Sequence, residues 1–337
     1  MVKVRIGVIG LGAIAQVVHL PILSKLKEVE LVAVCDIDKS KAKYVGERYG
    51  VKRFYGDPKA ALGDGGIDAV VVCTPTNTHR DIALLAIESG VDALVEKPIA
   101  RNYAEAVEIA DVAKKHKRNV MVGMNNRFRP DSMILKSFVE NGELGKIFYV
   151  KAGWLRKQSV SSPWFTSKEE SGGGVFLDLG IAVMDLALWL VGYPEVKRVS
   201  ASNYSLITKK VEDSSMVFLT MKDGSTLVTE ASWSFQTEDN FFYCDLFGTQ
   251  GSARVNPLRI NKSASGGHGS LVNVTPTKLE THQNLYKRSY EYELKHFVGA
   301  VRGLNPVISS ADEAVKRMKI VDAIYMSAEK GKEIVLS

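Results

Sequence analysis

Val4-Arg-Ile-Gly-Val-Ile-Gly10-Leu-Gly12-Ala-Ile-Ala15 is the stretch of sequence that decides the fold. Its apolar first half is typical of a buried strand, and its second half matches the pattern G-x-G-x-x-A at the start of a helical segment. In such a unit the first glycine permits a tight turn, the second lets the backbone approach a pyrophosphate, and the small third residue keeps the helix close to the strand. The alternative is a glycine turn in an unrelated α/β protein. We predict a dinucleotide site whose contacts come from Gly10, Gly12, Ala13 and Ile14.

The first part of the chain alternates short apolar strands with helical segments. The predicted strands are Val4–Ile9, Leu31–Cys35, Ala69–Cys73, Ala93–Val95 and Val120–Met124, and the predicted helices are Ala13–Leu26, Lys39–Tyr49, His79–Ser89 and Tyr103–Lys117. Pro21 is expected to kink the first of these helices. Uninterrupted apolar strands separated by helices indicate a parallel sheet covered on both faces.

The pattern changes after residue 124. Helices are predicted at Pro130–Glu140, Val175–Val191, Tyr290–Val301 and Ala311–Glu329, and strands at Lys146–Leu155 and Glu333–Leu336, whereas 256–288 has little pattern. Between residues 196 and 255, alternating apolar and polar residues with turn signals predict a mostly antiparallel sheet. We therefore predict an α/β protein with a Rossmann domain, 1–124, and a second α+β domain with a large open sheet, 125–337. The closing helices, 290–330, are expected to pack back on the first domain.

Asp36 ends the second predicted strand, 26 residues after Gly10. An acid at this position can accept hydrogen bonds from both hydroxyls of an adenosine ribose and repels a 2′-phosphate, which favours NAD over NADP. Lys39, Lys41 and Lys43 lie nearby and would soften the preference. Asp36 could instead cap the next helix, but Asp38 is available for that role.

Lys97 ends another strand, in Ala93-Leu-Val-Glu-Lys-Pro98. Ligands of open α/β sheets bind at the carboxyl ends of the strands. A lysine in a partly closed apolar cleft can lose its proton near neutral pH, and can then take a proton from an alcohol as hydride leaves the carbon. The alternative is a lysine in a surface salt bridge.

Four motifs together resemble the Gfo/Idh/MocA oxidoreductases, which include glucose–fructose oxidoreductase and inositol 2-dehydrogenase. They are Gly10–Ala15, Cys73-Thr-Pro-Thr-Asn-Thr-His79, Glu96-Lys-Pro98 and Gly172-Gly-Gly-Val-Phe-Leu-Asp178, and Gly123-Met-Asn-Asn-Arg-Phe-Arg-Pro130 extends the likeness. The resemblance runs in order along most of the chain and is weakest between 256 and 288. It implies NAD(H)-dependent chemistry on a hydroxyl of a sugar, inositol or sugar derivative. It also implies oligomers made through the open sheet, and we expect a homodimer or homotetramer.

The resemblance also implies roles for single residues. Those near the cofactor would be Thr74, Pro75, Asn77, His79, Glu96, Lys97, Arg127 and Trp164, and those near the substrate would be Lys97, Asn125, Arg156, Trp164 and Asp178. It further implies that the Lys97–Pro98 bond is cis. Arg156 could bind an acidic sugar or simply be solvated.

The helix Val175–Val191 carries the second predicted catalytic residue. Asp178, Ala182 and Asp185 fall on one face of an apolar helix, and a carboxylate there is costly unless it is paired or used. Three glycines before the helix would let the backbone approach a ligand. We predict that Asp178 is functional and that Asp185 is structural.

Ala182 departs from the family pattern Asp-x-Gly-x-His-x-x-Asp, because it stands where the family has a catalytic histidine. Lys97 could act alone, with Asp178 orienting the substrate hydroxyl, which is the explanation we favour. Another group could replace the histidine, such as His268, His282, Tyr286 or a residue of the 156–168 loop. The protein could also keep NAD bound in redox-neutral chemistry, or be a nucleotide-binding sensor with little turnover.

Composition excludes several other classes of protein. The net charge of +6 arises from interspersed charges, and no nucleic-acid-binding motif accompanies it, so we expect no nucleic-acid partner. The six histidines have no ligand spacing, so no metal is expected. Cys35, Cys73 and Cys244 are interpreted as reduced buried thiols. We see no signal peptide and no apolar stretch long enough to span a bilayer, and expect a cytoplasmic protein acting on a small molecule.

Overall fold

The computed structural model describes residues 2–157, 163–263, 271–276 and 281–336. It divides into two compact units. Unit 1 contains Met1–Met124 and Tyr290–Met318, and unit 2 contains Asn125–Ser289 and Lys319–Ser337. The predicted domains, 1–124 and 125–337, remain a prediction about which segments fold independently.

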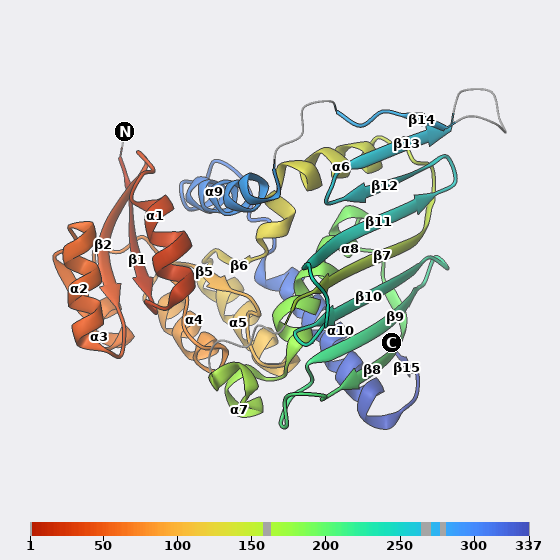
Figure 1. Cartoon of the computed structure of the whole chain (residues 1–337). Helices are drawn as coiled ribbons and strands as arrows, with labels where there is room; N and C mark the ends of the chain where they lie inside the picture. Colours follow the sequence, from red (N-terminus) through yellow and green to blue (C-terminus); the bar gives the residue numbers. More distant parts are fainter. Residues whose placement is uncertain (1, 158–162, 264–270, 277–280, 337) are drawn as a thin grey trace. The chain divides into compact units, whose positions relative to one another are not determined.

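Unit 1 is built on a six-stranded sheet with the strand order β3-β2-β1-β4-β5-β6, in which every pair of neighbours is parallel (Figure 1). Its strands are β1 (Val4–Ile9), β2 (Val29–Cys35), β3 (Arg53–Tyr55), β4 (Ala69–Val72), β5 (Asp92–Glu96) and β6 (Val120–Gly123). The predicted parallel sheet is confirmed. The sequence prediction missed β3 and the short helix α3 (Pro58–Gly63), because three residues are too few to show a strand pattern.

The helices of unit 1 begin and end at the expected local signals. They are α1 (Leu20–Leu23), α2 (Lys39–Tyr49), α4 (His79–Glu88) and α5 (Tyr103–His116). Asp38 caps α2 by accepting from Lys41 N at 3.1 Å, and Asn102 caps α5 by accepting from Glu105 N at 3.0 Å. Pro21 lies in the first turn of α1, which directly follows a π-helical turn, Ala15–His19. The closing segment is joined to β6, since Val122 N donates to Ser309 O at 2.8 Å.

Unit 2 contains a nine-stranded sheet in the order β14-β13-β12-β11-β7-β10-β9-β8-β15 (Figure 1). Its strands are β7 (Ile147–Leu155), β8 (Val196–Tyr204), β9 (Ser214–Met221), β10 (Thr226–Ser232), β11 (Phe241–Gly248), β12 (Gly251–Val255), β13 (Arg259–Ser263), β14 (Leu271–Asn273) and β15 (Ile334–Val335). Only the β7–β10 pair is parallel among these described strands, so the predicted mostly antiparallel sheet is confirmed. The poorly patterned 256–288 region contributes β13, β14 and the start of α9 (His282–Val301). The remaining long helices are α6 (Pro130–Glu140) and α10 (Ala311–Lys330).

The core of unit 2 surrounds one apolar helix. A π-helical turn, Phe176–Gly180, leads into α8 (Ile181–Leu190), which packs on β7, β10 and β11. The stretch Lys168–Leu190 is long and apolar enough to cross a membrane by length and composition alone, so the expectation that no such stretch exists was wrong. However, 89% of its most apolar window is buried inside the protein, which is typical of a core helix.

A buried ion pair connects α8 to the short helical turn η3 (Asn125–Phe128). Arg127 donates to both carboxylate oxygens of Asp185 at 2.7 Å, and Tyr193 Oη donates to the same carboxylate at 2.6 Å. Both side chains of the pair are 1% exposed. This ion pair is compatible with the predicted structural role of Asp185, and it offers little support for the cofactor contact expected of Arg127.

Replacing Arg127 with methionine should leave Asp185 buried without its counter-charge. We expect the free energy of unfolding to fall by about 3–5 kcal/mol, as measured by urea denaturation of the protein without ligands. The matched control is Arg5→Met, which breaks the exposed ion pair between Arg5 and Asp68 and should leave stability close to that of the wild type. Equal losses in the two variants would contradict a special role for the buried pair.

Candidate active site

The glycine turn after β1 is shaped for two different purposes. Gly10 has a φ of +87°, and a Cβ atom there would lie 2.7 Å from the backbone nitrogen of Thr74. Gly12 is exposed, and a Cβ atom there would have no heavy atom within 4 Å. Gly10 is therefore required by packing against the segment after β4, whereas the open space at Gly12 leaves the first N–H groups of the helix accessible to an anion. Ala13 is exposed and Ile14 is half-buried beside it.

Asp36 holds the end of β2 against this glycine turn. One carboxylate oxygen accepts from Leu11 N at 2.9 Å, and the other accepts from Asp38 N at 3.0 Å and from Lys41 Nζ at 3.2 Å. Ile37 is 94% exposed next to it, and this apolar surface was not identified from the sequence. An acceptor beside an apolar surface fits the ribose and base of a nucleotide, so these residues are compatible with a dinucleotide.

The segment after β4 is connected to the segment after β5 by one imidazole. His79 is 1% exposed, and its ring nitrogens lie 2.8 Å from Pro98 O and 2.8 Å from Thr74 O. Burial lowers the pKa of His79, and the two backbone hydrogen bonds oppose this effect. His79 therefore positions the two segments, while Asn77 has a buried Oδ1 without a hydrogen-bond partner among the described residues. Thr74 and Pro75 lie on the same segment.

Lys97 directly follows β5 at the carboxyl edge of the sheet, where it is half-buried, and its bond to Pro98 is cis. Beside it, Glu96 accepts from His19 Nε2 at 2.7 Å. Burial raises the pKa of Glu96, but the hydrogen bond from His19 and the charges of His19 and Lys97 outweigh this and lower it. Glu96 is therefore ionised next to Lys97. The contact between His19 and Glu96 was not predicted from the sequence.

Unit 2 carries the other predicted catalytic residue in an aromatic setting. Asp178 lies in the π-helical turn, half-buried, and accepts from Trp233 Nε1 at 3.0 Å. Phe165 meets the Trp233 ring edge-on at 6.3 Å between centroids and stacks on Trp164 at 3.9 Å. Trp233 was not identified from the sequence, because its indole reaches Asp178 from another part of the chain.

Arg156 lies at the end of β7, over a further aromatic ring. Its guanidinium carbon is 4.6 Å from the ring centroid of Trp154. Trp154 packs against the same cluster as Phe165 and Trp233. This cation–π contact holds Arg156 against the aromatic cluster and leaves its role towards a substrate untested.

The turn before Asp178 is held by a buried carboxyl group that the sequence analysis missed. Glu212 accepts from Gly174 N at 2.9 Å, from Phe176 N at 3.0 Å and from Tyr325 Oη at 2.7 Å. A Cβ atom at Gly173 would lie 2.1 Å from Tyr325 Oη, and one at Gly174 would lie 1.9 Å from Glu212 O. Protein atoms therefore pack against Gly173 and Gly174 on the side where a Cβ atom would lie, and the approach of a ligand to this turn stays a prediction.

The π-helical turn also separates Asp178 from the residues below it. A π turn has one more residue than an α-helical turn, so Asp178 is not in regular register with Asp185. Asp178 is half-buried, whereas Ala182 is 5% exposed and Asp185 is 1% exposed.

The proposed replacements for the family histidine are only partly described. His268, residues 158–162 of the loop and the side chain of His282 lie outside the described residues, and Tyr286 is half-buried with a partner of its own. Asn125, which was expected to bind substrate, is buried. Its side-chain Nδ2 donates to Ser289 Oγ at 2.9 Å, so one of its hydrogen-bonding groups already has a partner within the protein.

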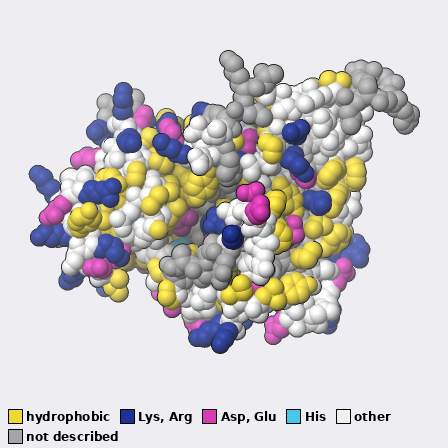
Figure 2. Space-filling model, viewed as in Figure 1, with side chains coloured by type: hydrophobic (Ala, Val, Ile, Leu, Met, Phe, Trp, Pro, Cys, Tyr) yellow, Lys and Arg dark blue, Asp and Glu magenta, His cyan; other side chains and the backbone are white. Residues whose placement is uncertain are grey.

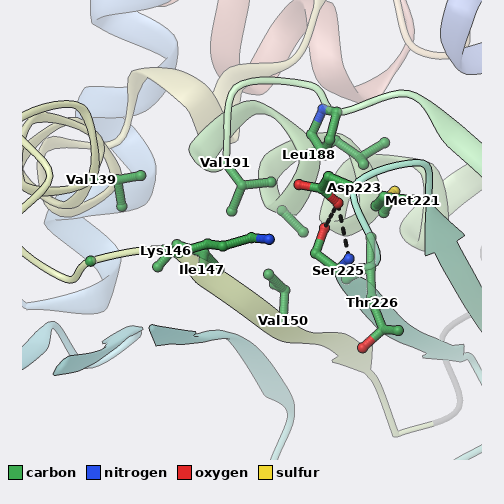
Figure 3. A pocket seen from close by; sticks show the side chains of 14 residues that line it. Val139, Lys146, Ile147, Val150, Leu188, Val191, Met221, Asp223, Ser225 and Thr226 are labelled. Carbon is green, nitrogen blue, oxygen red and sulfur yellow. Dashed lines mark hydrogen bonds between the residues drawn. The ribbon is translucent and has the colours of Figure 1, made fainter. Parts of the chain in front are cut away.

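A cavity of about 220 Å³ opens at one end of the unit 2 sheet, away from these residues. Figure 3 shows Lys146 extending into it, with Val139, Ile147 and Leu188 around it and Asp223 hydrogen-bonded to Ser225. The described lining contains none of the predicted site residues, so this cavity is not the candidate active site.

Comparison with known proteins connects both units to one family. Residues 4–124 match the oxidoreductase family with an NAD-binding Rossmann fold, and residues 133–254 match the GFO/IDH/MocA C-terminal domain. The chain is 31% identical to D-glucoside 3-dehydrogenase of Escherichia coli (strain K12), over 98% of this chain and 97% of that relative. It is 29% identical to scyllo-inositol 2-dehydrogenase (NAD(+)) of Bacillus subtilis (strain 168), over 93% and 91%.

Solved structures show the same fold. Levoglucosan dehydrogenase in complex with NADH and L-sorbose superposes with a TM-score of 0.90 at 22% identity, over 100% of both chains. With two family models that together span most of the sequence, this chain belongs to the Gfo/Idh/MocA oxidoreductases, and its N-terminal part is their NAD-binding Rossmann fold.

Proposed function

We propose that the protein transfers hydride between NAD(H) and a secondary hydroxyl of a sugar, inositol or sugar derivative. The position of Lys97 is the observation that carries this proposal. It lies at the carboxyl edge of the parallel sheet, half-buried, next to an ionised Glu96 and on the same edge as the glycine turn. The names of the relatives support the substrate class, since they are dehydrogenases of a glucoside and of an inositol.

The nucleotide would be held by the residues around the glycine turn. The first N–H groups of the helix at Gly12, Ala13 and Ile14 would bind the pyrophosphate, and Asp36 would accept from the adenosine ribose. The segment at Thr74, Pro75 and Asn77 would line the nicotinamide half, with His79 and Glu96 supporting it. When bound, the nicotinamide accepts or supplies the hydride.

The proton would be exchanged at Lys97 Nζ, and Asp178 would orient the substrate hydroxyl. Trp233 supports this role for Asp178, because its indole N–H holds one carboxylate oxygen and so fixes the direction of the other. The apolar faces of the half-buried Trp164 and Phe165 suit the C–H face of a sugar ring. Arg156 and Asn125 would complete the substrate contacts.

Ala182 favours a second candidate function. An alanine can neither accept a proton nor hydrogen-bond a hydroxyl, so a redox-neutral enzyme with retained NAD, or a weakly active nucleotide sensor, would need no histidine there. These functions predict nucleotide binding without a net change in nicotinamide absorbance.

We also propose a cytoplasmic homo-oligomer. The three cysteines are buried thiols without disulfides, as suits a reducing compartment. Met216 and Phe218 of β9 are 52% and 43% exposed on one face of the unit 2 sheet, and a second copy could cover them. Figure 2 shows Lys and Arg side chains scattered among acidic and apolar ones on the face in view, which offers no support for a nucleic-acid partner.

An initial-rate screen tests the proposed function directly. The purified protein with NAD is assayed by nicotinamide absorbance against sugars, inositols, sugar acids and sugar nucleotides. Turnover with one class is expected and would name the substrate. A sample that binds NADH but changes absorbance with no compound would instead support the redox-neutral or sensor function.

Replacing Lys97 with methionine should lower kcat by about 10²–10⁴-fold, because the proton carrier is lost while the length and packing of the side chain are kept. The dissociation constant for NADH, measured by fluorescence titration, should change little. Lys115→Met at an exposed position of α5 is the control. Undiminished turnover in the Lys97 variant would end the assignment of this lysine.

Replacing Asp36 with asparagine should weaken NADH binding by about tenfold and strengthen NADPH binding, because the variant removes the charge that repels a 2′-phosphate. Both constants are measured by fluorescence titration. Asp38→Asn is the matched control, since asparagine is an equally good helix cap and the same charge is removed two residues away. If the control changes the NADPH to NADH preference as much as Asp36→Asn does, the ribose contact is not the cause.

A further inference from the structure

A carboxyl group that the proposed mechanism does not use lies fully buried in unit 1. Glu293 in α9 is 0% exposed, and neither of its carboxylate oxygens has a hydrogen-bond partner among the described residues. Carboxyl groups are rarely found in such a position, because removing an ionised carboxylate from water without a partner is very costly. Its side chain therefore needs an explanation beyond packing.

Several titratable groups from other elements face Glu293. Glu96 at the end of β5 is close enough for its charge to act on Glu293, and Cys73, just after β4, is acted on by both carboxyl groups. His19, in the first helical segment, meets the ring of Tyr290 edge-on at 5.9 Å between centroids. Tyr290 and Glu293 lie one turn apart on the same face of α9, so the contact between His19 and Tyr290 places the first helical segment near this face of α9.

The two carboxyl groups of this cluster have different partners. Glu96 accepts from His19 Nε2 at 2.7 Å, whereas Glu293 has no hydrogen-bond partner among the described residues and is exposed to the negative charge of Glu96. Burial and this like charge raise the pKa of Glu293 well above its usual value, while the pKa of Glu96 is lowered. Two carboxylates in one apolar site cannot both ionise at neutral pH without a large cost.

We propose that His19, Glu96 and Glu293 form a positioning cluster that holds a single negative charge, on Glu96, beside Lys97, and that Glu293 is its protonated member. The effect on Lys97 rests on the proposed function, whereas the protonation of Glu293 does not. A protonated carboxyl has one O–H donor, and His19 Nδ1 is another buried polar atom that has no hydrogen-bond partner among the described residues.

Proton linkage in the protein without ligands tests the protonated state. A group whose folded-state pKa is raised contributes stability that is fully present below the unfolded-state pKa of about 4.3 and is lost as the pH rises towards and through the folded-state pKa. Glu293→Gln removes this loss. The ratio of the variant's folding equilibrium constant to that of the wild type should therefore rise with pH above about 4.3, by up to about tenfold per pH unit while the wild-type carboxyl stays protonated in the folded state.

Glu291→Gln is the matched control, because Glu291 is on the same helix but is 38% exposed and paired with Lys295. Its ratio should be flat with pH. Glu293→Met serves the same purpose as Glu293→Gln if the glutamine variant does not fold. A flat ratio for the Glu293 variant would overturn the cluster, whatever the activity of the enzyme.

The pH dependence of kcat/KM tests the effect on Lys97. Glu96→Gln removes the charge, and His19→Phe removes the hydrogen bond that keeps Glu96 ionised, so both should move the acid-side fall of the profile to lower pH. Glu293→Gln removes no charge and should leave it in place. Unmoved profiles in the first two variants, with the linkage as expected, would overturn only the effect on Lys97. If no compound of the screen gives turnover while the linkage is as expected, the proposed function fails and the protonated cluster stands.

Discussion

A carboxyl group that loses contact with water must gain a counter-charge, donated hydrogen bonds or a proton, and the candidate site depends on how this constraint is met. Asp185 is met by Arg127, which connects α8 to the turn before α6. Glu212 is met by two backbone N–H groups and a tyrosine hydroxyl, which hold the turn before Asp178. Glu96 accepts a hydrogen bond from His19, and for Glu293 we propose a proton. The first three arrangements each hold a segment that carries or adjoins a proposed functional side chain, namely Asn125, Asp178 and Lys97.

The two units share a local feature, a π-helical turn that follows a glycine-rich turn. In each, a glycine-rich turn leads into a π-helical turn at the start of a buried helical segment, Ala15–His19 in unit 1 and Phe176–Gly180 in unit 2. The extra residue of a π turn rotates the side chains that precede it relative to those that follow. This allows Asp178 to remain half-buried above a helix whose next polar residue is enclosed, and it places the buried His19 at the end of its own turn, where it reaches Glu96.

Elements whose bounds are set by their own residues could be predicted from the sequence. The bounds of β1, α2 and α6 match the sequence prediction, because apolar periodicity and caps such as Asp38 act within one element. β3, β13 and β14 are too short to show a periodic pattern of apolar residues, and such a pattern does not reveal a π-helical turn. The glycine turn, Asp36 and Lys97 could be predicted because each directly follows a strand of the parallel sheet. His19, Glu212 and Trp233 could not, because their contacts join residues 77, 38 and 55 positions apart.

The surroundings of Asp178 bear on the absent histidine. Where the family has an imidazole, this chain has Ala182, which is 5% exposed and lies among apolar side chains of α8. Asp178 accepts a hydrogen bond from the indole N–H of Trp233, a group that donates to a carboxylate but cannot take up a proton. An Asp178–Trp233 pair can therefore orient a hydroxyl without accepting its proton. The proposed function therefore assigns the exchange of the proton to another residue, and Lys97, which directly follows β5 beside Glu96, is the residue proposed for it.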